Sequence, residues 1–214
     1  NKINIKVTKG PLETESVSDL AISSLLLGDS SFDVILIDIT WLPKYAAAGW
    51  LVSLDQLIEK GEWESLAPGA RLGNSYENKI YRWPFVADMG LLYWRSDLMP
   101  EPPKTPEELI DISLKLKQTG KVKYGYVWQG RQYEGLICVF LEVLNAFGGG
   151  WINDSNEITL SNKKSIQAAK WLKKLITSGA SPKSVTNFSE TEALQAFKEG
   201  NAALMRNWPY AWAE

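Results

Sequence analysis

The sequence of 214 residues contains no histidine and a single cysteine. Without histidine the commonest general base and a common metal ligand are missing, and nucleophilic catalysis that uses a histidine base is excluded. Cys138 has no partner for an intrachain disulfide, and it cannot build a zinc or iron–sulfur site alone. We therefore expect no metal and no cofactor, and chemistry that favours ligand binding over turnover.

Long apolar runs and an excess of positive charge are also missing. No stretch approaches the about 20 apolar residues that a membrane-spanning helix needs, and no secretory signal is present. Lys and Arg total 23 against 25 Asp and Glu, which gives a formal net charge of −2. Because a nucleic-acid-binding surface needs a basic patch, the sequence predicts no nucleic-acid partner.

Aromatic residues are abundant instead. The chain has ten tryptophans, and several of them stand in short clusters with polar neighbours. One cluster contains Trp208 and Trp212, with Tyr210 between them. Flat apolar rings beside acidic and amide side chains suit a ligand with an apolar face and a rim of hydroxyls, because the rings stack on C–H groups while the polar side chains pair with the hydroxyls. A sugar is such a ligand.

The start of the chain has the pattern of a βαβ unit. Residues 3–7 alternate apolar and polar, residues 17–27 are apolar at helical spacing, and residues 34–37 form a continuous apolar run typical of a buried parallel strand. The pattern predicts an α/β sheet, in which ligands bind beyond the carboxyl ends of the strands. Asp38 and Trp41 follow the apolar run and fall at that place.

Further elements are predicted along the rest of the chain. Patterns typical of a capping box, at Thr105–Glu108 and at Ser189–Glu192, predict the starts of two helices. Residues 134–147 are apolar nearly all round, which predicts a buried helix. The remaining expected elements are helices at 43–48, 54–59 and 166–176 and extended segments at 80–84, 90–95, 124–129 and 202–205.

Three carboxylates leave an enzymatic alternative open. Two carboxylates can cleave a glycosidic bond, and Asp38, Asp88 and Glu134 are the candidates for a glycoside hydrolase. Each also has a structural interpretation: Asp38 as a helix N-cap, Asp88 as a hydrogen-bonded buried group, and Glu134 as a negative charge at a helix N-terminus. A protein-interaction module is a third hypothesis.

Several segments, in order, resemble the solute-binding proteins of ABC sugar importers, in particular the maltose/trehalose-binding group. They include Gly90-Leu91-Leu92-Tyr93-Trp94-Arg95-Ser96-Asp97-Leu98 and Met205-Arg206-Asn207-Trp208-Pro209-Tyr210. The other segments that carry the resemblance are 28–38, 48–55, 102–109 and 126–130 with 133–136.

The resemblance implies a two-lobed α/β fold of the periplasmic-binding-protein type, in which crossing hinge strands join the lobes and the lobes close on a sugar. Lobe one would comprise residues 1–92 with the return strand 206–214, and lobe two residues 93–205. The sugar contacts implied by the resemblance are Asp38, Asp88, Trp208 and Tyr210, with weaker transfers to Trp41, Gln129, Tyr133 and Glu134.

The resemblance also implies a function, which is the non-covalent capture of a disaccharide or related glucoside for an ABC importer. The partners would be the sugar and a membrane permease. The protein would be monomeric and periplasmic or extracellular, held at the membrane by the transporter or by a lipid anchor outside this chain. The family has further segments before the position of Asn1 and after Glu214, so the resemblance implies an incomplete chain with exposed sheet edges in lobe one.

Overall fold

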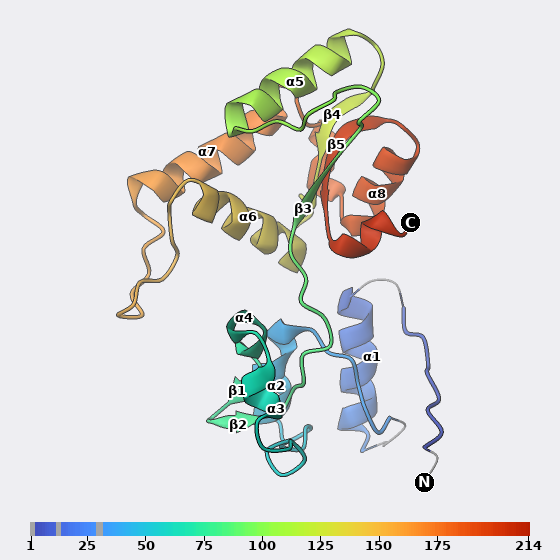
Figure 1. The fold of residues 1–214 in the computed structure, drawn as a ribbon, viewed down its shortest axis with the longest axis vertical. Helices are drawn as coiled ribbons and strands as arrows, with labels where there is room; N and C mark the ends of the chain where they lie inside the picture. The colour runs from blue at the N-terminus through green and yellow to red at the C-terminus, as the bar shows by residue number, and fades with distance from the viewer. Residues whose placement is uncertain (1–2, 12–13, 29–31) are drawn as a thin grey trace. The chain divides into compact units, whose positions relative to one another are not determined.

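The computed structural model describes residues 3–11, 14–28 and 32–214. The chain forms two compact units, Asn1–Ala87 and Asp88–Glu214, each with its own apolar core (Figure 1). Residues 29–31, part of one segment that carries the family resemblance, lie outside the described residues. Residues 206–214 belong to the second unit in this division, whereas the sequence assigns them to lobe one; the assignment of lobes stays a prediction.

The second unit is built on a three-stranded sheet in the order β3-β5-β4. Strand β3 (Leu91–Trp94) runs antiparallel to β5 (Ala202–Asn207), and β4 (Tyr124–Val127) runs parallel to it. Because β5 is hydrogen-bonded on both edges and packed against two apolar clusters, all six of its residues are buried. The extended segments predicted at 90–95, 124–129 and 202–205 are confirmed.

Helices pack against this sheet, and their ends follow the sequence signals. Thr105 caps α5 (Pro106–Gln118) by accepting a hydrogen bond from the Glu108 amide at 3.1 Å. The Glu108 carboxylate accepts from the Lys104 amide at 2.7 Å rather than from Thr105, so this capping box is half formed. The box that opens α8 (Glu190–Lys198) is complete, with both Ser189 and Glu192 in their capping roles.

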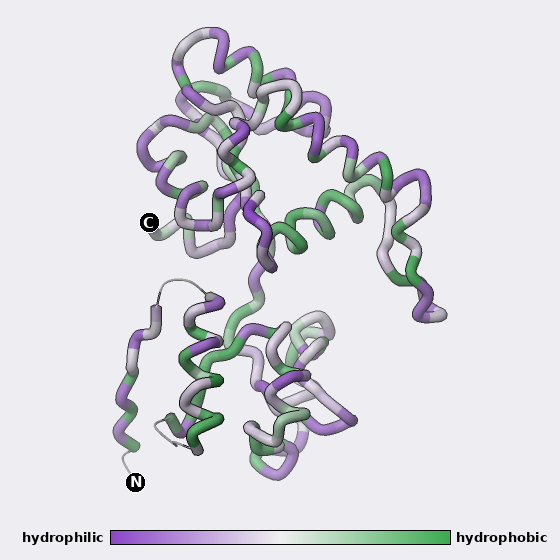
Figure 2. Tube along the Cα trace, turned by 180° about the vertical axis from the view of Figure 1, so that it is seen from behind, coloured by the Kyte–Doolittle hydropathy of each residue, from purple (hydrophilic) through white to green (hydrophobic). Residues whose placement is uncertain are grey.

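Helix α6 (Glu134–Ala146) is less buried than its sequence predicts. Its apolar composition is visible along most of its length (Figure 2), and it packs one face on the core beside α7 (Lys163–Thr177). Ile137, on the other face, is 51% exposed. The prediction of a buried helix is therefore correct for one face only, because no element of the second unit covers the other.

The first unit is a small helical unit around Tyr45, which is fully buried. Its core joins α1 (Thr14–Leu26) to α2 (Leu42–Ala47) through Ala21, Ile37 and Leu42. The Tyr45 hydroxyl lies 3.3 Å from the Ser18 hydroxyl, which satisfies both groups inside the core. The remaining elements are a 3₁₀ turn at Ile39–Trp41, α3 (Glu62–Ser65), α4 (Pro68–Arg71), β1 (Ser75–Tyr76) and β2 (Lys79–Ile80).

The predicted βαβ unit does not form. Residues 3–7 and 34–37 are in no strand, and Ile5 and Val34 are 84% and 88% exposed. A strand needs a neighbour for its backbone hydrogen bonds, and the described part of the chain offers these segments none. Two further predictions are wrong: residues 54–59 form turns rather than a helix, and the strand expected at 80–84 shortens to β2, which pairs with β1.

Leu204→Ala tests the importance of β5 to the second unit. Leu204 is fully buried in the core, so the substitution should lower the free energy of unfolding by about 2–5 kcal/mol. Ile137→Ala, at an exposed apolar position on α6, should change it by less than about 0.5 kcal/mol. Urea unfolding followed by tryptophan fluorescence measures both, and equal losses for the two variants would contradict the assignment of the core.

Candidate functional site

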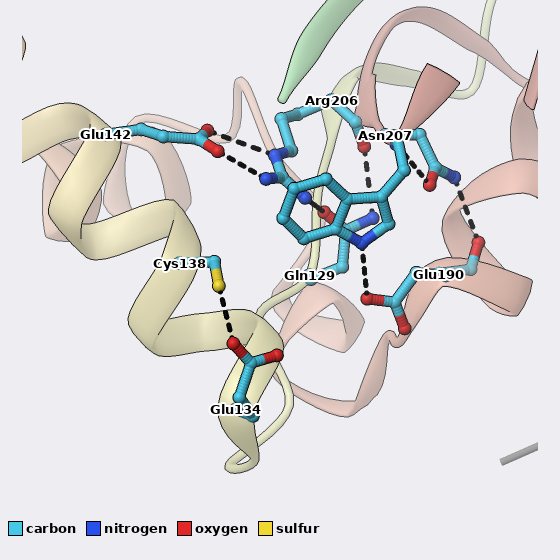
Figure 3. Close-up of polar contacts among 8 residues, drawn as sticks. Gln129, Glu134, Cys138, Glu142, Glu190, Arg206 and Asn207 are labelled. Carbon is cyan, nitrogen blue, oxygen red and sulfur yellow. Dashed lines mark hydrogen bonds and ion pairs between the residues drawn. The ribbon is translucent and has the colours of Figure 1, made fainter. Parts of the chain in front are cut away.

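Polar and aromatic side chains gather at one end of the second unit's sheet, where its two parallel strands end. Strands β4 and β5 are parallel, so their carboxyl ends, at Val127 and Asn207, lie on the same side of the sheet. The carboxyl ends of the strands are where α/β sheets bind ligands. Helix α6 follows β4 with its N-terminus at this end, and Glu190 at the start of α8 accepts a hydrogen bond there from Asn207 at 3.2 Å. Figure 3 shows the resulting group of side chains around Arg206.

Arg206 lies at the centre of this group and is 4% exposed. Its guanidinium forms an ion pair with Glu142 of α6 through Nε, at 3.1 Å, and through Nη2. Nη1 donates to the side-chain oxygen of Gln129 at 2.9 Å. The guanidinium carbon Cζ lies over the Trp208 ring, 3.8 Å from the ring centroid, a cation–π contact.

Trp208 is half-buried and is held at several points. The indole N–H donates to the Glu190 carboxylate at 3.1 Å. The backbone N–H of Trp208 donates to Asn207 Oδ1 at 2.8 Å, and its carbonyl accepts from the Tyr93 hydroxyl at 2.8 Å. The indole is therefore held at its N–H and covered on one face, and the backbone of Trp208 is held at both its N–H and its carbonyl.

Gln129, a ligand contact implied by the family resemblance, is fully buried beneath Arg206. Its amide nitrogen donates to the Arg206 carbonyl at 3.0 Å, and its amide oxygen accepts from the Arg206 guanidinium. Both ends of the amide are thus engaged within the protein. That Gln129 contacts ligand stays a prediction, and its position here is that of a support for Arg206.

The start of α6 holds two more of the predicted residues. Tyr133 is half-buried, and the Arg131 guanidinium lies 4.6 Å from its ring centroid. Burial, with a further contribution from Glu190, raises the pKa of the Tyr133 hydroxyl well above its usual value. The Glu134 carboxylate accepts a hydrogen bond from the Cys138 thiol at 2.7 Å. Burial first and then Glu134 raise the pKa of Cys138 to about 12, so the thiol stays protonated at neutral pH.

Tyr210 lies in the short 3₁₀ turn Pro209–Trp212 that follows β5, and it is 46% exposed. Burial of part of the side chain raises the pKa of its hydroxyl, and Glu190 adds to the effect. Tyr210 therefore remains a neutral hydrogen-bonding group over the physiological pH range, and its ring is accessible.

The predicted residues of the first unit have different surroundings. Asp38 caps the 3₁₀ turn Ile39–Trp41 and accepts hydrogen bonds from the Thr40 amide at 2.8 Å and the Thr40 hydroxyl at 2.7 Å. This is the N-cap role that was the structural alternative for Asp38. Trp41 stacks on Tyr45 with the ring centroids 6.2 Å apart. Asp88, at the start of the second unit, is exposed in a segment without regular structure.

The structure thus groups Gln129 and Trp208 around Arg206, and it places Tyr133 and Glu134 together at the start of α6. Sequence reasoning missed Arg206, Glu142 and Glu190 as members of the group. A signal for Arg206 was present, since a charge at the end of an apolar buried strand needs a partner. A hollow of about 450 Å³ in the first unit, lined by Trp63 and Ile80 among others, contains none of the predicted residues.

A sequence model of the family described as bacterial extracellular solute-binding protein matches residues 1–214. The chain belongs to this family. A probable ABC transporter-binding protein of Deinococcus radiodurans is 37% identical over 220 residues, which cover 98% of this chain and 51% of that protein. A maltotriose-binding protein of Pyrococcus abyssi is 28% identical over 172 residues, 80% of this chain and 36% of that protein.

Solved structures agree with this membership. The maltose-bound structure of T. maritima MalE3 matches with a TM-score of 0.85 and 32% identity, over 95% of this chain and 53% of that one. A solute-binding protein of Thermotoga lettingae, 21% identical, has a TM-score of 0.82 over 92% of this chain and 53% of its own. The predicted fold class, α/β of the periplasmic-binding-protein type, is confirmed. The chain spans about half the length of the Deinococcus and T. maritima proteins.

Family membership favours binding over the glycoside hydrolase that the carboxylates left open. Within residues 3–11, 14–28 and 32–214, acidic and cysteine side chains form no group of three suited to hold a metal ion. Among the helices of these same residues, none has the length and apolar character required to cross a bilayer.

The capping box of α8 gives a prediction on pH dependence. Burial alone would raise the pKa of Glu192, but hydrogen bonds from the Ser189 hydroxyl and amide outweigh it and hold the pKa below its usual value. A lowered pKa stabilises the folded state above the unfolded pKa of about 4.3, and this stabilisation is lost as the pH falls through the folded pKa. The first turn of α8 should therefore open more readily below about pH 4.

Amide hydrogen exchange, corrected for its intrinsic pH dependence, measures this opening at Ser189 and Glu192. Glu192→Gln should remove the pH dependence, while Glu64→Gln in the first unit should leave it unchanged. Identical pH curves for the unaltered chain and Glu192→Gln would show that the carboxylate does not stabilise this turn.

Proposed function

We propose that this chain forms part of the substrate-binding component of an ABC sugar importer and contributes to the non-covalent binding of a disaccharide or related glucoside. The observation that carries the proposal is the Trp208 indole, fixed by Glu190 and Arg206 at the carboxyl edge of the sheet. A fixed aromatic face suits the C–H face of a pyranose, and carboxylates near it suit the hydroxyls.

The comparisons support a sugar as the ligand. The T. maritima protein, at 32% identity, is maltose-bound, and the relative from Pyrococcus abyssi is named for maltotriose. In the proposal, Trp208 and Tyr210 form the stacking wall while Asp38 and Asp88 accept hydrogen bonds from sugar hydroxyls. Trp41, Tyr133 and Glu134 contribute at the periphery.

The proposal includes the mechanical role of the lobes. Lobe one would comprise residues 1–92 with 206–214, lobe two residues 93–205, and the sugar would bind between them. Closure would shift a two-state equilibrium by as much as the sugar prefers the closed form. The protein would act as a periplasmic or extracellular monomer that delivers sugar to a membrane permease, in agreement with the name of the Deinococcus relative.

Trp208→Ala tests the proposed stacking wall. Titration of the unaltered chain with maltose, maltotriose and trehalose should give saturable heat in calorimetry and a saturable change in tryptophan fluorescence. Trp208→Ala should weaken the affinity by about tenfold or more, since the loss of one stacking surface costs on the order of 1–2 kcal/mol. Circular dichroism should stay unchanged.

Trp151→Ala is the matched control, because Trp151 is half exposed in the loop between α6 and α7, and it should bind sugar like the unaltered chain. Absence of binding to all three sugars would contradict the proposal for this chain. Continuous release of glucose during the titration would contradict its non-covalent character and support the hydrolase.

A further inference from the structure

Arg206 is held in one orientation by groups that lie in the plane of its guanidinium. Glu142 engages Nε and Nη2 on one side, and Gln129 accepts from Nη1. A planar guanidinium with in-plane partners on these sides cannot rotate without breaking hydrogen bonds. The guanidinium is therefore held in a fixed position, with Cζ over the Trp208 ring.

This arrangement determines which face of Trp208 remains available. The Arg206 guanidinium covers one face of the indole at 3.8 Å from the centroid, and the Glu190 carboxylate holds the indole N–H. With one face covered and the edge held, the opposite face is the side on which a sugar ring can stack. Because the ring is already oriented, less side-chain entropy is lost when the ligand binds.

The support extends to the elements on either side of β5. Glu142 belongs to α6, and its carboxylate lies against Gly90 next to β3, so close that a Cβ at position 90 would overlap it. Gln129 follows β4 and is fully buried, with both ends of its amide engaged by Arg206. The orientation of Arg206 is thus determined by residues from α6 and from the segment after β4.

We propose that Arg206 is a positioning residue for sugar binding: held by Glu142 and Gln129, it fixes Trp208 so that one indole face stacks on the sugar. The inference rests on the proposed function and assigns Gln129 and Glu142 a role through Arg206 rather than direct contact with ligand. A purely structural Arg206 would instead affect stability and leave the indole's order and its coupling to the sugar unchanged.

A double-mutant cycle tests the coupling. Arg206→Lys keeps the charge but lacks the planar fork, so we expect it to weaken maltotriose affinity by roughly fivefold to tenfold. In the Trp208→Ala background the same substitution should have almost no further effect. An equal loss of affinity in both backgrounds would overturn the proposal, because Arg206 would then act independently of Trp208.

A readout without sugar separates this inference from the proposed function. The indole N–H resonance of Trp208, assigned with Trp208→Phe, should be a single sharp peak in the unaltered chain and should broaden or divide in Arg206→Lys. Glu142→Gln, at a half-exposed position, should do the same to a smaller degree. Arg95→Lys, which alters the ion pair with Asp97, is the control and should leave the peak unchanged.

The outcomes are distinct. If the unaltered chain binds no sugar, the proposed function fails, and the resonance of Trp208 still reports whether Arg206 orders the indole. If sugar binds but the Trp208 peak is the same in Arg206→Lys as in the unaltered chain, the positioning role is wrong while the proposed function stands.

Discussion

Hydrogen bonding on both edges of β5 is the constraint on which the second unit depends. With β3 on one side and β4 on the other, the strand is buried along its whole length, and its polar residues stand together at its end. Arg206 and Asn207 occupy that end, and the chain turns into Trp208 directly after it. The position of the aromatic group thus follows from strand pairing and needs no long-range loop.

A buried guanidinium at the end of an apolar strand is costly unless its donors are satisfied. Glu142 from α6 and Gln129 after β4 satisfy them, so the charge ties three elements together while it supports the indole. The same contacts that prevent an unpaired buried charge therefore give the edge of the sheet its order.

The sequence predicted the second unit well. Its signals are local: the capping residue Ser189, the proline after Thr105 and the apolar run before Arg206 each specify a boundary within a few residues. The side-chain group was only partly predictable. Trp208 was named from its aromatic cluster and Gln129 from the family resemblance. Glu142 stands eight residues into α6 and joins them only through a contact with Arg206, 64 positions away along the chain.

The first unit was predicted poorly for a different reason. The patterns at 3–7 and 34–37 are typical of strands, but a strand forms only when it pairs with another strand. The sequence of a segment does not specify which strand that partner is. Residues 54–59 are too few to stabilise an isolated helix, so their apolar spacing alone did not make one.

Cys138 has a practical consequence for the study of this protein. Its thiol is half-buried and hydrogen-bonded to Glu134, and its raised pKa keeps the reactive thiolate scarce at neutral pH. A cysteine introduced on an exposed surface, at Trp151 for example, would react with a maleimide fluorophore far faster than the native one. A fluorophore can therefore be attached at a chosen position of this chain without first removing its own thiol.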